Sequence, residues 1–212
     1  MNRIEEQVLS AKRPVALTGA GISAPSGIPT FQGTWRGRPI RDFLSRDFFE
    51  AHPRQFFELY CEMVSWCRKE PNPAHLQLAK WGLPIITQNI DGLHHKAGSK
   101  GEILELHGTL RHVACRRCGR TMDAEAFAAK FLRDGDYHCP CGQTWDTDVV
   151  LYGDAVRHLD RAWALAQSCD VMLVVGTSLT TYPAAALPDA ARQSGARVIE
   201  VNDDCIGRLT GP

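Results

Sequence analysis

Residues 15–33 read VALTGAGISAPSGIPTFQG, an apolar run followed by glycines and then by a stretch rich in Gly, Pro and Ser. The apolar part predicts a buried strand that ends near Gly19. Gly19 and Gly21 allow a tight turn in which backbone N–H groups approach a phosphate, as at the start of a dinucleotide-binding fold. A plain strand–turn–helix corner uses the same glycines, so this segment alone leaves both interpretations open.

Similar apolar runs recur along the chain and alternate with segments of helical spacing. Each run has the length of a strand buried on both faces of a parallel sheet. The pattern predicts an α/β fold, a Rossmann-like doubly wound parallel sheet, with no helix after the last strand. The predicted strands are residues 15–19, 84–87, 103–107, 148–152, 171–176 and 197–202, and the main predicted helices are 53–69, 159–169 and 183–194.

Composition limits the class of protein. The 212 residues suit one domain with a small insert, and the 24 basic side chains balance the 24 acidic ones. A chain without net charge has no overall field for nucleic acid or an anionic membrane surface. No stretch reaches the roughly 18 apolar residues of a membrane span, and the N-terminus does not resemble a signal peptide. We therefore expect a cytoplasmic protein without nucleic-acid or membrane partners; the sequence does not indicate its oligomeric state.

Four of the eight cysteines form two close pairs, Cys115 with Cys118 and Cys139 with Cys141. Paired thiolates at this spacing suit a closed tetrahedral Zn²⁺ site, which is structural and not catalytic. His138 is an alternative ligand to one of them. The other four cysteines are scattered and expected to be buried. We predict an inserted zinc-binding module over residues 114–145, between Rossmann-like segments 1–113 and 146–212.

Polar residues follow several predicted strands at their carboxyl ends. In an open α/β sheet these ends form the ligand crevice, so the groups are expected to share one site for an extended ligand such as a dinucleotide. The alternatives are a helix cap for Asp91, a structural role for His107, and plain turns elsewhere. The residues concerned are Gln88, Asn89, Asp91, His107, Gly176, Thr177, Ser178, Asn202 and Asp203.

Taken in order, GAGISAPSGIPTF, TQNID, LHG, the paired cysteines, VVGTS and the late VN resemble the sirtuin family over most of the chain. The resemblance implies that NAD is the co-substrate, that zinc is structural, and that an acyl-lysine peptide is the partner. It makes His107 the general base and Asn89 a second catalytic-site residue. It also assigns NAD contacts to Gly19, Ala20, Gly21, Ser23, Phe31, Gln32, Gln88, Asn89, Asp91, Gly176, Thr177, Ser178, Asn202 and Asp203.

The activity implied is NAD-dependent protein-lysine deacylation. The acyl-lysine carbonyl oxygen attacks the nicotinamide ribose, nicotinamide leaves, and His107 deprotonates a ribose hydroxyl that takes over the acyl group. An NAD glycohydrolase or mono-ADP-ribosyltransferase would use the same pocket, and so would a catalytically silent NAD-binding module.

The chain is expected to depart from the family in three places. The first is the C-terminal helix common in the family, whose absence implies an adenine side that is partly open or closed by another subunit. Thr30 and Gln32 stand where most relatives carry Asp and Arg, which implies weaker contacts to the diphosphate of NAD. Tyr60 and Met63 match the positions of a Tyr-x-x-Arg pair in relatives that remove acidic acyl groups, so we expect a neutral acyl group, unless both residues are simply core. The resemblance also implies that Val149, Val150, Leu151, Tyr152 and Gly153 pair with the substrate peptide by β-augmentation.

Overall fold

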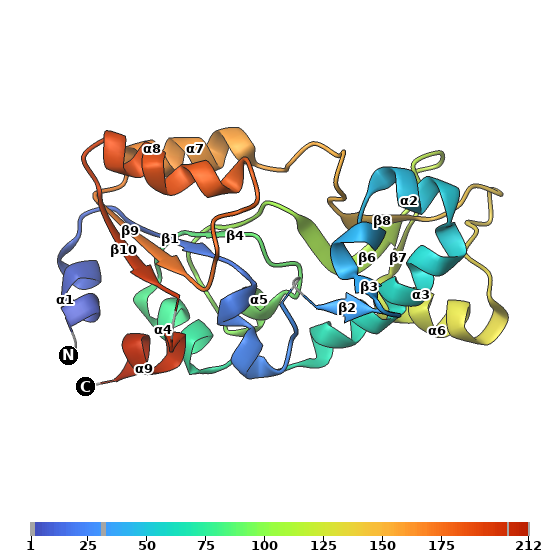
Figure 1. Ribbon diagram of the computed structural model, residues 1–212, viewed down its shortest axis with the longest axis horizontal. Coiled ribbons are helices and arrows are strands. Elements are labelled where there is room, and N and C mark those ends of the chain that lie inside the picture. Colours follow the sequence, from blue (N-terminus) through green and yellow to red (C-terminus); the bar gives the residue numbers. More distant parts are fainter. Residues whose placement is uncertain (1–2, 31–32, 203, 212) are drawn as a thin grey trace.

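A computed structural model describes residues 3–30, 33–202 and 204–211 and shows two lobes joined through the middle of the chain (Figure 1). The lobe that holds both chain ends is built on a five-stranded sheet of order β10-β9-β1-β4-β5, in which every neighbouring pair is parallel. Its strands are β1 (Pro14–Thr18), β4 (Ile85–Thr87), β5 (Ile103–Glu105), β9 (Val171–Val175) and β10 (Arg197–Val201).

Both faces of this sheet are covered, because successive side chains of each strand point to opposite sides. In β1, Leu17 packs into the cluster under α7 and α8, whereas Ala16 packs into the cluster under α1, α4 and α9. The predicted Rossmann-like α/β class is confirmed. The helices are α1 (Arg3–Ser10), α4 (Pro73–Trp81), α7 (Leu159–Ser168), α8 (Leu187–Gln193) and α9 (Cys205–Thr210), with the short α5 (Leu93–Lys96) at the carboxyl edge.

The second lobe contains an antiparallel sheet of order β7-β6-β8, with helices packed against it. Aromatic side chains dominate its core, for example Phe57, Phe127 and Trp145. The elements are β6 (Gly108–Ala114), β7 (Thr121–Asp123), β8 (Asp146–Val149), α2 (Arg46–Ala51), α3 (Pro53–Val64) and α6 (Ala124–Asp134), with the two-residue strands β2 (Thr34–Trp35) and β3 (Arg38–Pro39) nearby.

Two predictions about the strands and helices are wrong. The run 148–152 is not a strand of the parallel sheet: β8 ends at Val149 and pairs antiparallel with β6. A helix does follow the last strand, because Asp204 caps α9 by accepting from the backbone N–H of Gly207, and Leu209 is buried against the sheet lobe. The predicted helix 53–69 continues beyond α3 only as a 3₁₀ turn, Ser65–Arg68.

One hydrophobic cluster of the second lobe joins residues from 35–64 with residues from 110–151. The predicted module boundaries at 114 and 145 fall inside this cluster, so the domain division stays a prediction. Among the described residues, no helix has the length and apolar character needed to cross a membrane.

Candidate functional site

The loops that follow β1 and β9 touch each other at the carboxyl edge of the parallel sheet. A Cβ on Gly19 would lie 2.6 Å from the Cβ of Thr177, and one on Gly21 would lie 2.8 Å from the Cα of Gly176. The N–H of Gly21 donates to the carbonyl of Gly176 at 2.7 Å. Close packing of two loops therefore requires these glycines; their contact with a phosphate stays a prediction.

Ser23, Asn89 and Asp91 form a buried hydrogen-bonded group beside these loops. The Ser23 hydroxyl donates to Asp91 Oδ2 at 2.7 Å and accepts from Asn89 Nδ2 at 3.1 Å, while Asn89 Nδ2 also donates to the carbonyl of Gly19. Asn89 Oδ1 is buried and has no hydrogen-bond partner among the described residues. An unpaired buried acceptor is costly, so this atom suits a donor from a ligand.

Asp91 serves two local purposes. Its Oδ1 accepts from the backbone N–H of Leu93 at 2.9 Å, as the cap interpretation predicts, and its Oδ2 holds Ser23. Burial raises the pKa of this carboxyl, and the hydrogen bonds oppose that shift. The cap interpretation and the site interpretation are therefore compatible.

A small cavity opens beside this group. Its walls are formed by the loop after β1, the loop after β4, and Trp66 from the 3₁₀ turn after α3. Trp66 carries no site signal in the sequence, because an aromatic residue at the end of an amphipathic helix looks like core. The lining residues are Ala20, Ser23, Ile28, Pro29, Trp66, Asn89, Ile90 and Asp91.

His107 lies between β5 and β6, where the parallel sheet passes into the second lobe. Its Nδ1 lies 3.1 Å from the carbonyl of Gln88. A carbonyl only accepts, so Nδ1 carries the proton and Nε2 keeps a free lone pair. Burial lowers the pKa of His107, and the hydrogen bond to Gln88 opposes this. The imidazole is therefore neutral at pH 7 and suited to act as a base.

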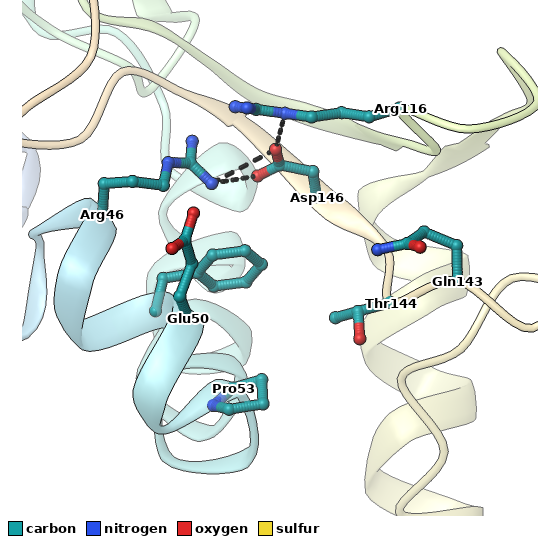
Figure 2. A pocket seen from close by; sticks show the side chains of 8 residues that line it. Arg46, Glu50, Pro53, Arg116, Gln143, Thr144 and Asp146 are labelled. Carbon is teal, nitrogen blue, oxygen red and sulfur yellow. Dashed lines mark hydrogen bonds and ion pairs between the residues drawn. The ribbon is translucent and has the colours of Figure 1, made fainter.

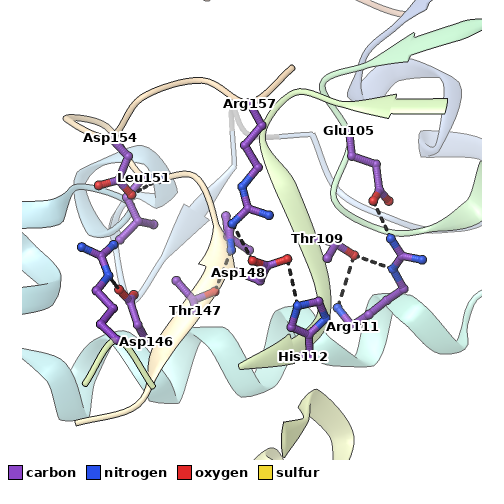
Figure 3. A network of polar contacts seen from close by, with 12 residues as sticks. Glu105, Thr109, Arg111, His112, Asp146, Thr147, Asp148, Leu151, Asp154 and Arg157 are labelled. Carbon is purple, nitrogen blue, oxygen red and sulfur yellow. Dashed lines mark hydrogen bonds and ion pairs between the residues drawn. The ribbon is translucent and has the colours of Figure 1, made fainter. Parts of the chain in front are cut away.

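Ion pairs on either side hold the loop of His107 in place (Figure 3). Arg111 of β6 bonds Glu105 of β5, and Arg157 bonds Asp148 while its backbone N–H donates to the carbonyl of Leu106. These residues were not predicted, since charged side chains without a motif give no signal in a single sequence.

The far end of the predicted NAD site is organised around Thr177. Its hydroxyl donates to Gln88 Oε1 at 2.8 Å, and its N–H donates to Asn202 Oδ1 at 3.1 Å. Ser178 is exposed and pairs with Thr180. Phe31, Gln32 and Asp203 lie outside the described residues.

Two histidines, not predicted as functional, are buried behind the site. His75 Nε2 lies 3.4 Å from the Ser23 hydroxyl, and His94 Nε2 lies 2.8 Å from the Thr18 hydroxyl. Burial lowers the pKa of His75 to about 4 and that of His94 to about 3. Both are therefore neutral near pH 7.

Tyr60 and Met63 are fully buried in the aromatic core of the second lobe. The Tyr60 hydroxyl donates to the carbonyl of His112 at 3.4 Å. This is the core role that sequence analysis left open for both residues, and their contact with an acyl group stays a prediction.

The segment predicted to pair with a peptide continues β8 towards the crevice. Its backbone N–H groups already donate within the chain: Val150 to His107, Tyr152 to Leu44, and Leu151 to the carboxylate of Asp154. A peptide strand would therefore have to donate to carbonyl oxygens here, and the pairing of Val149–Gly153 stays a prediction.

The four paired cysteines come together as predicted. All four sulfur atoms lie within 4.8 Å of one another. Cys115 Sγ is 3.5 Å from Cys141 Sγ, and Cys118 Sγ is 3.6 Å from Cys139 Sγ. Tetrahedral Zn²⁺ with Zn–S bonds of about 2.3 Å requires sulfurs about 3.8 Å apart. The donor set fits a structural zinc ion, and His138 instead bonds Asp136.

Comparison with known proteins agrees with this geometry. The profile described as "Sir2 family" matches residues 19–183. The chain is 39% identical to the NAD-dependent protein deacetylase of Saccharolobus solfataricus, covering 94% of this chain and 84% of the relative. It is 41% identical to NAD-dependent protein deacylase 2 of Archaeoglobus fulgidus, covering 95% and 84%. A solved structure described as "Sir2-p53 peptide-NAD+" superimposes with a TM-score of 0.89 at 31% identity, covering 99% and 96%.

Proposed function

Since the chain belongs to the Sir2 family and is an NAD-dependent protein-lysine deacylase, we propose that the reaction takes place at the carboxyl edge of its parallel sheet, with His107 as the base. The acyl group passes to ADP-ribose and nicotinamide is released. NAD, when bound, supplies the ribose carbon that accepts the acyl-lysine oxygen.

The protonation state of His107 is the observation that carries this proposal. Gln88 holds the proton on Nδ1, and burial keeps the ring neutral, so Nε2 can take a proton from a hydroxyl of the bound ribose. A positioned base of this kind accelerates a reaction by about 10² to 10⁴.

Asn89 would contact the substrate through its free Oδ1. Because Ser23 and Gly19 occupy both N–H bonds of its amide, the oxygen is fixed towards the cavity and accepts from a ligand hydroxyl or amide. Its orientation does not need to change on binding, which favours catalysis by a preorganised site.

The remaining assignments follow the same arrangement. Thr177 and Asn202 would face the adenosine half of NAD, and Cys115, Cys118, Cys139 and Cys141 would hold a zinc ion that stabilises the second lobe without a chemical role. Because Met63 is buried in a hydrophobic cluster and cannot pair with a carboxylate, a neutral acyl group is the expected substrate. No disulfide joins the eight cysteines, all of which lie among the described residues, and this suits a reducing, cytoplasmic environment.

Replacing His107 tests the proposal. We expect His107→Ala to lower kcat for deacylation by at least about 10²-fold while NAD binding changes little. His52→Ala, at an exposed histidine between α2 and α3, is the matched control and should keep most of its activity. If kcat for deacylation falls equally in both variants, or if His107→Ala keeps full activity, His107 is excluded as the base.

A further inference from the structure

A hollow of about 290 Å³ lies in the second lobe, outside the cavity that holds Asn89. One wall comes from α2 and the start of α3, and the other comes from the cysteine-rich segment before β8 (Figure 2). Neither the cavity of Asn89 nor the loop of His107 contributes to it. The lining residues are Arg46, Phe49, Glu50, Pro53, Arg116, Gln143, Thr144 and Asp146.

The charges of the hollow are almost, but not fully, balanced. The Asp146 carboxylate is bonded by both Arg46 and Arg116, and Arg46 also bonds Asp154 at 2.7 Å. Glu50 is exposed and has no ion-pair partner in residues 3–30, 33–202 and 204–211. Two cations and two carboxylates line the hollow, but Arg46 is shared with Asp154, which lies outside the lining. The carboxylate left without a counter-charge is therefore that of Glu50.

The uncharged walls suit a long cationic side chain. Phe49 and Pro53 give an apolar surface for methylene groups, and the Gln143 amide and the Thr144 hydroxyl on the opposite wall are uncharged polar groups. Lysine and arginine have this combination of an apolar stem and a charged head.

Arg46, which lines the hollow, is also bonded through its backbone to the segment proposed to bind the peptide. The backbone N–H of Arg46 donates to the carbonyl of Tyr152 at 2.9 Å, and Ser45 forms a bridge with the same residue. Tyr152 itself is 54% exposed, so a chain passing over it can reach the wall formed by Arg46.

We propose that this hollow is a specificity subsite for a lysine or arginine of the protein substrate that flanks the acyl-lysine, with Glu50 as its counter-charge. The proposal rests on the proposed function, because a peptide must first bind along Tyr152. The subsite would give the enzyme a preference for substrates with a basic residue near the acyl-lysine, through Glu50, which lies outside the crevice where the acyl group is transferred.

The test is a panel of acetyl-lysine peptides in which one lysine or one glutamate replaces norleucine at each flanking position in turn. With the wild-type protein, one position should lower KM by about two- to fivefold at low salt with kcat unchanged, as for a partly exposed ion pair. Glu50→Gln should abolish this difference, and Glu50→Lys should reverse it. Asp47→Asn, which removes a charge from the same helix outside the hollow, is the control and should keep the difference.

The outcomes separate the two levels of the proposal. If no peptide is deacylated, the proposed function fails. If every peptide is deacylated with the same KM, or if the preference survives in Glu50→Gln, the subsite is excluded while the function stands. A preference for glutamate in place of lysine would identify an anion site and would overturn the proposal.

Discussion

The crevice at the parallel sheet and the cysteine cluster of the second lobe satisfy their polar groups in opposite ways. In the crevice, Ser23, Asn89 and Asp91 bond one another, and one buried acceptor is left for a ligand. In the cluster, four sulfurs face each other, and only a cation can compensate their thiolate charge. The crevice is organised by the chain alone, whereas we expect a bound metal ion to hold the cysteine cluster together.

Removing the metal is the change with the largest expected effect. We expect Cys118→Ser, or chelation of zinc, to lower the free energy of unfolding of the second lobe by at least about 4 kcal/mol, since zinc binding contributes directly to folding. Hydrogen exchange should show loss of protection in β6 and β7, with β1 and β9 still protected.

Cys169→Ser is the control for that experiment. Cys169 is buried under α7, where a serine hydroxyl can donate to the carbonyl of Ala166 as the thiol does. Its zinc content should be unchanged. If the metal-free and zinc-loaded proteins have the same free energy of unfolding, the proposed contrast between the crevice and the cysteine cluster is wrong.

The free acceptor of the crevice is tested by Asn89→Ala. Loss of a preorganised contact should lower kcat by about 10²- to 10³-fold, with intact zinc and a smaller loss of stability. Ser178→Ala should lower kcat/KM by less than about threefold, because that exposed hydroxyl bonds only Thr180. If steady-state kinetics showed that both variants lose kcat/KM to a similar extent, a special role for Asn89 would be contradicted.

Acid should weaken the sheet lobe through its two buried histidines. Their folded-state pKa values of about 4 and about 3 lie below the ordinary value of 6.5, so the unfolded chain binds protons first. Stability is complete above pH 6.5 and falls as the pH drops towards 4; at pH 5.5 the loss is about 3 kcal/mol for both together.

Urea unfolding of zinc-saturated protein at pH 7.5 and 5.5 measures this loss. His94→Gln should reduce the pH-dependent difference by about half, whereas His52→Gln, at an exposed position, should leave it unchanged. If His94→Gln loses as much unfolding free energy between pH 7.5 and 5.5 as the wild type does, these histidines do not cause the acid sensitivity.

The smallest effect is expected at the contact between the two crevice loops. Gly21→Ala places a methyl group 2.8 Å from the Cα of Gly176 and should cost about 1 to 3 kcal/mol. Gly119→Ala has open space around the new methyl group but a φ of +72°, so it measures the cost of the backbone conformation alone. Thermal unfolding of both variants compares the two; an unchanged Tm for Gly21→Ala would show that the loops move apart easily.

The sequence predicted the elements whose pattern is local. The parallel strands, the cysteine cluster and the polar strand ends follow from runs of β-branched residues, from spacing, and from the rule that strand ends meet in one crevice. The run that contains β8 was predicted to join the parallel sheet, whereas β8 pairs antiparallel with β6. A short apolar run predicts a strand but not the strand with which it pairs.

Ion pairs between side chains that are distant in sequence could not be predicted for the same reason. Arg46 bonds Asp146 across 100 positions, and nothing in either neighbourhood indicates the pairing. Trp66 and the buried histidines likewise acquire their place only when α3, α4 and the loop after β4 come together.

The most direct test of the central claim is mass spectrometry of the products formed from NAD and an acetyl-lysine peptide by the zinc-loaded protein. We expect free lysine peptide, nicotinamide and acetyl-ADP-ribose in equal amounts, with the free lysine peptide and acetyl-ADP-ribose lost in His107→Ala. Free ADP-ribose or an ADP-ribosylated peptide, with the acetyl group still on lysine, would contradict the deacylase assignment and identify a glycohydrolase or an ADP-ribosyltransferase.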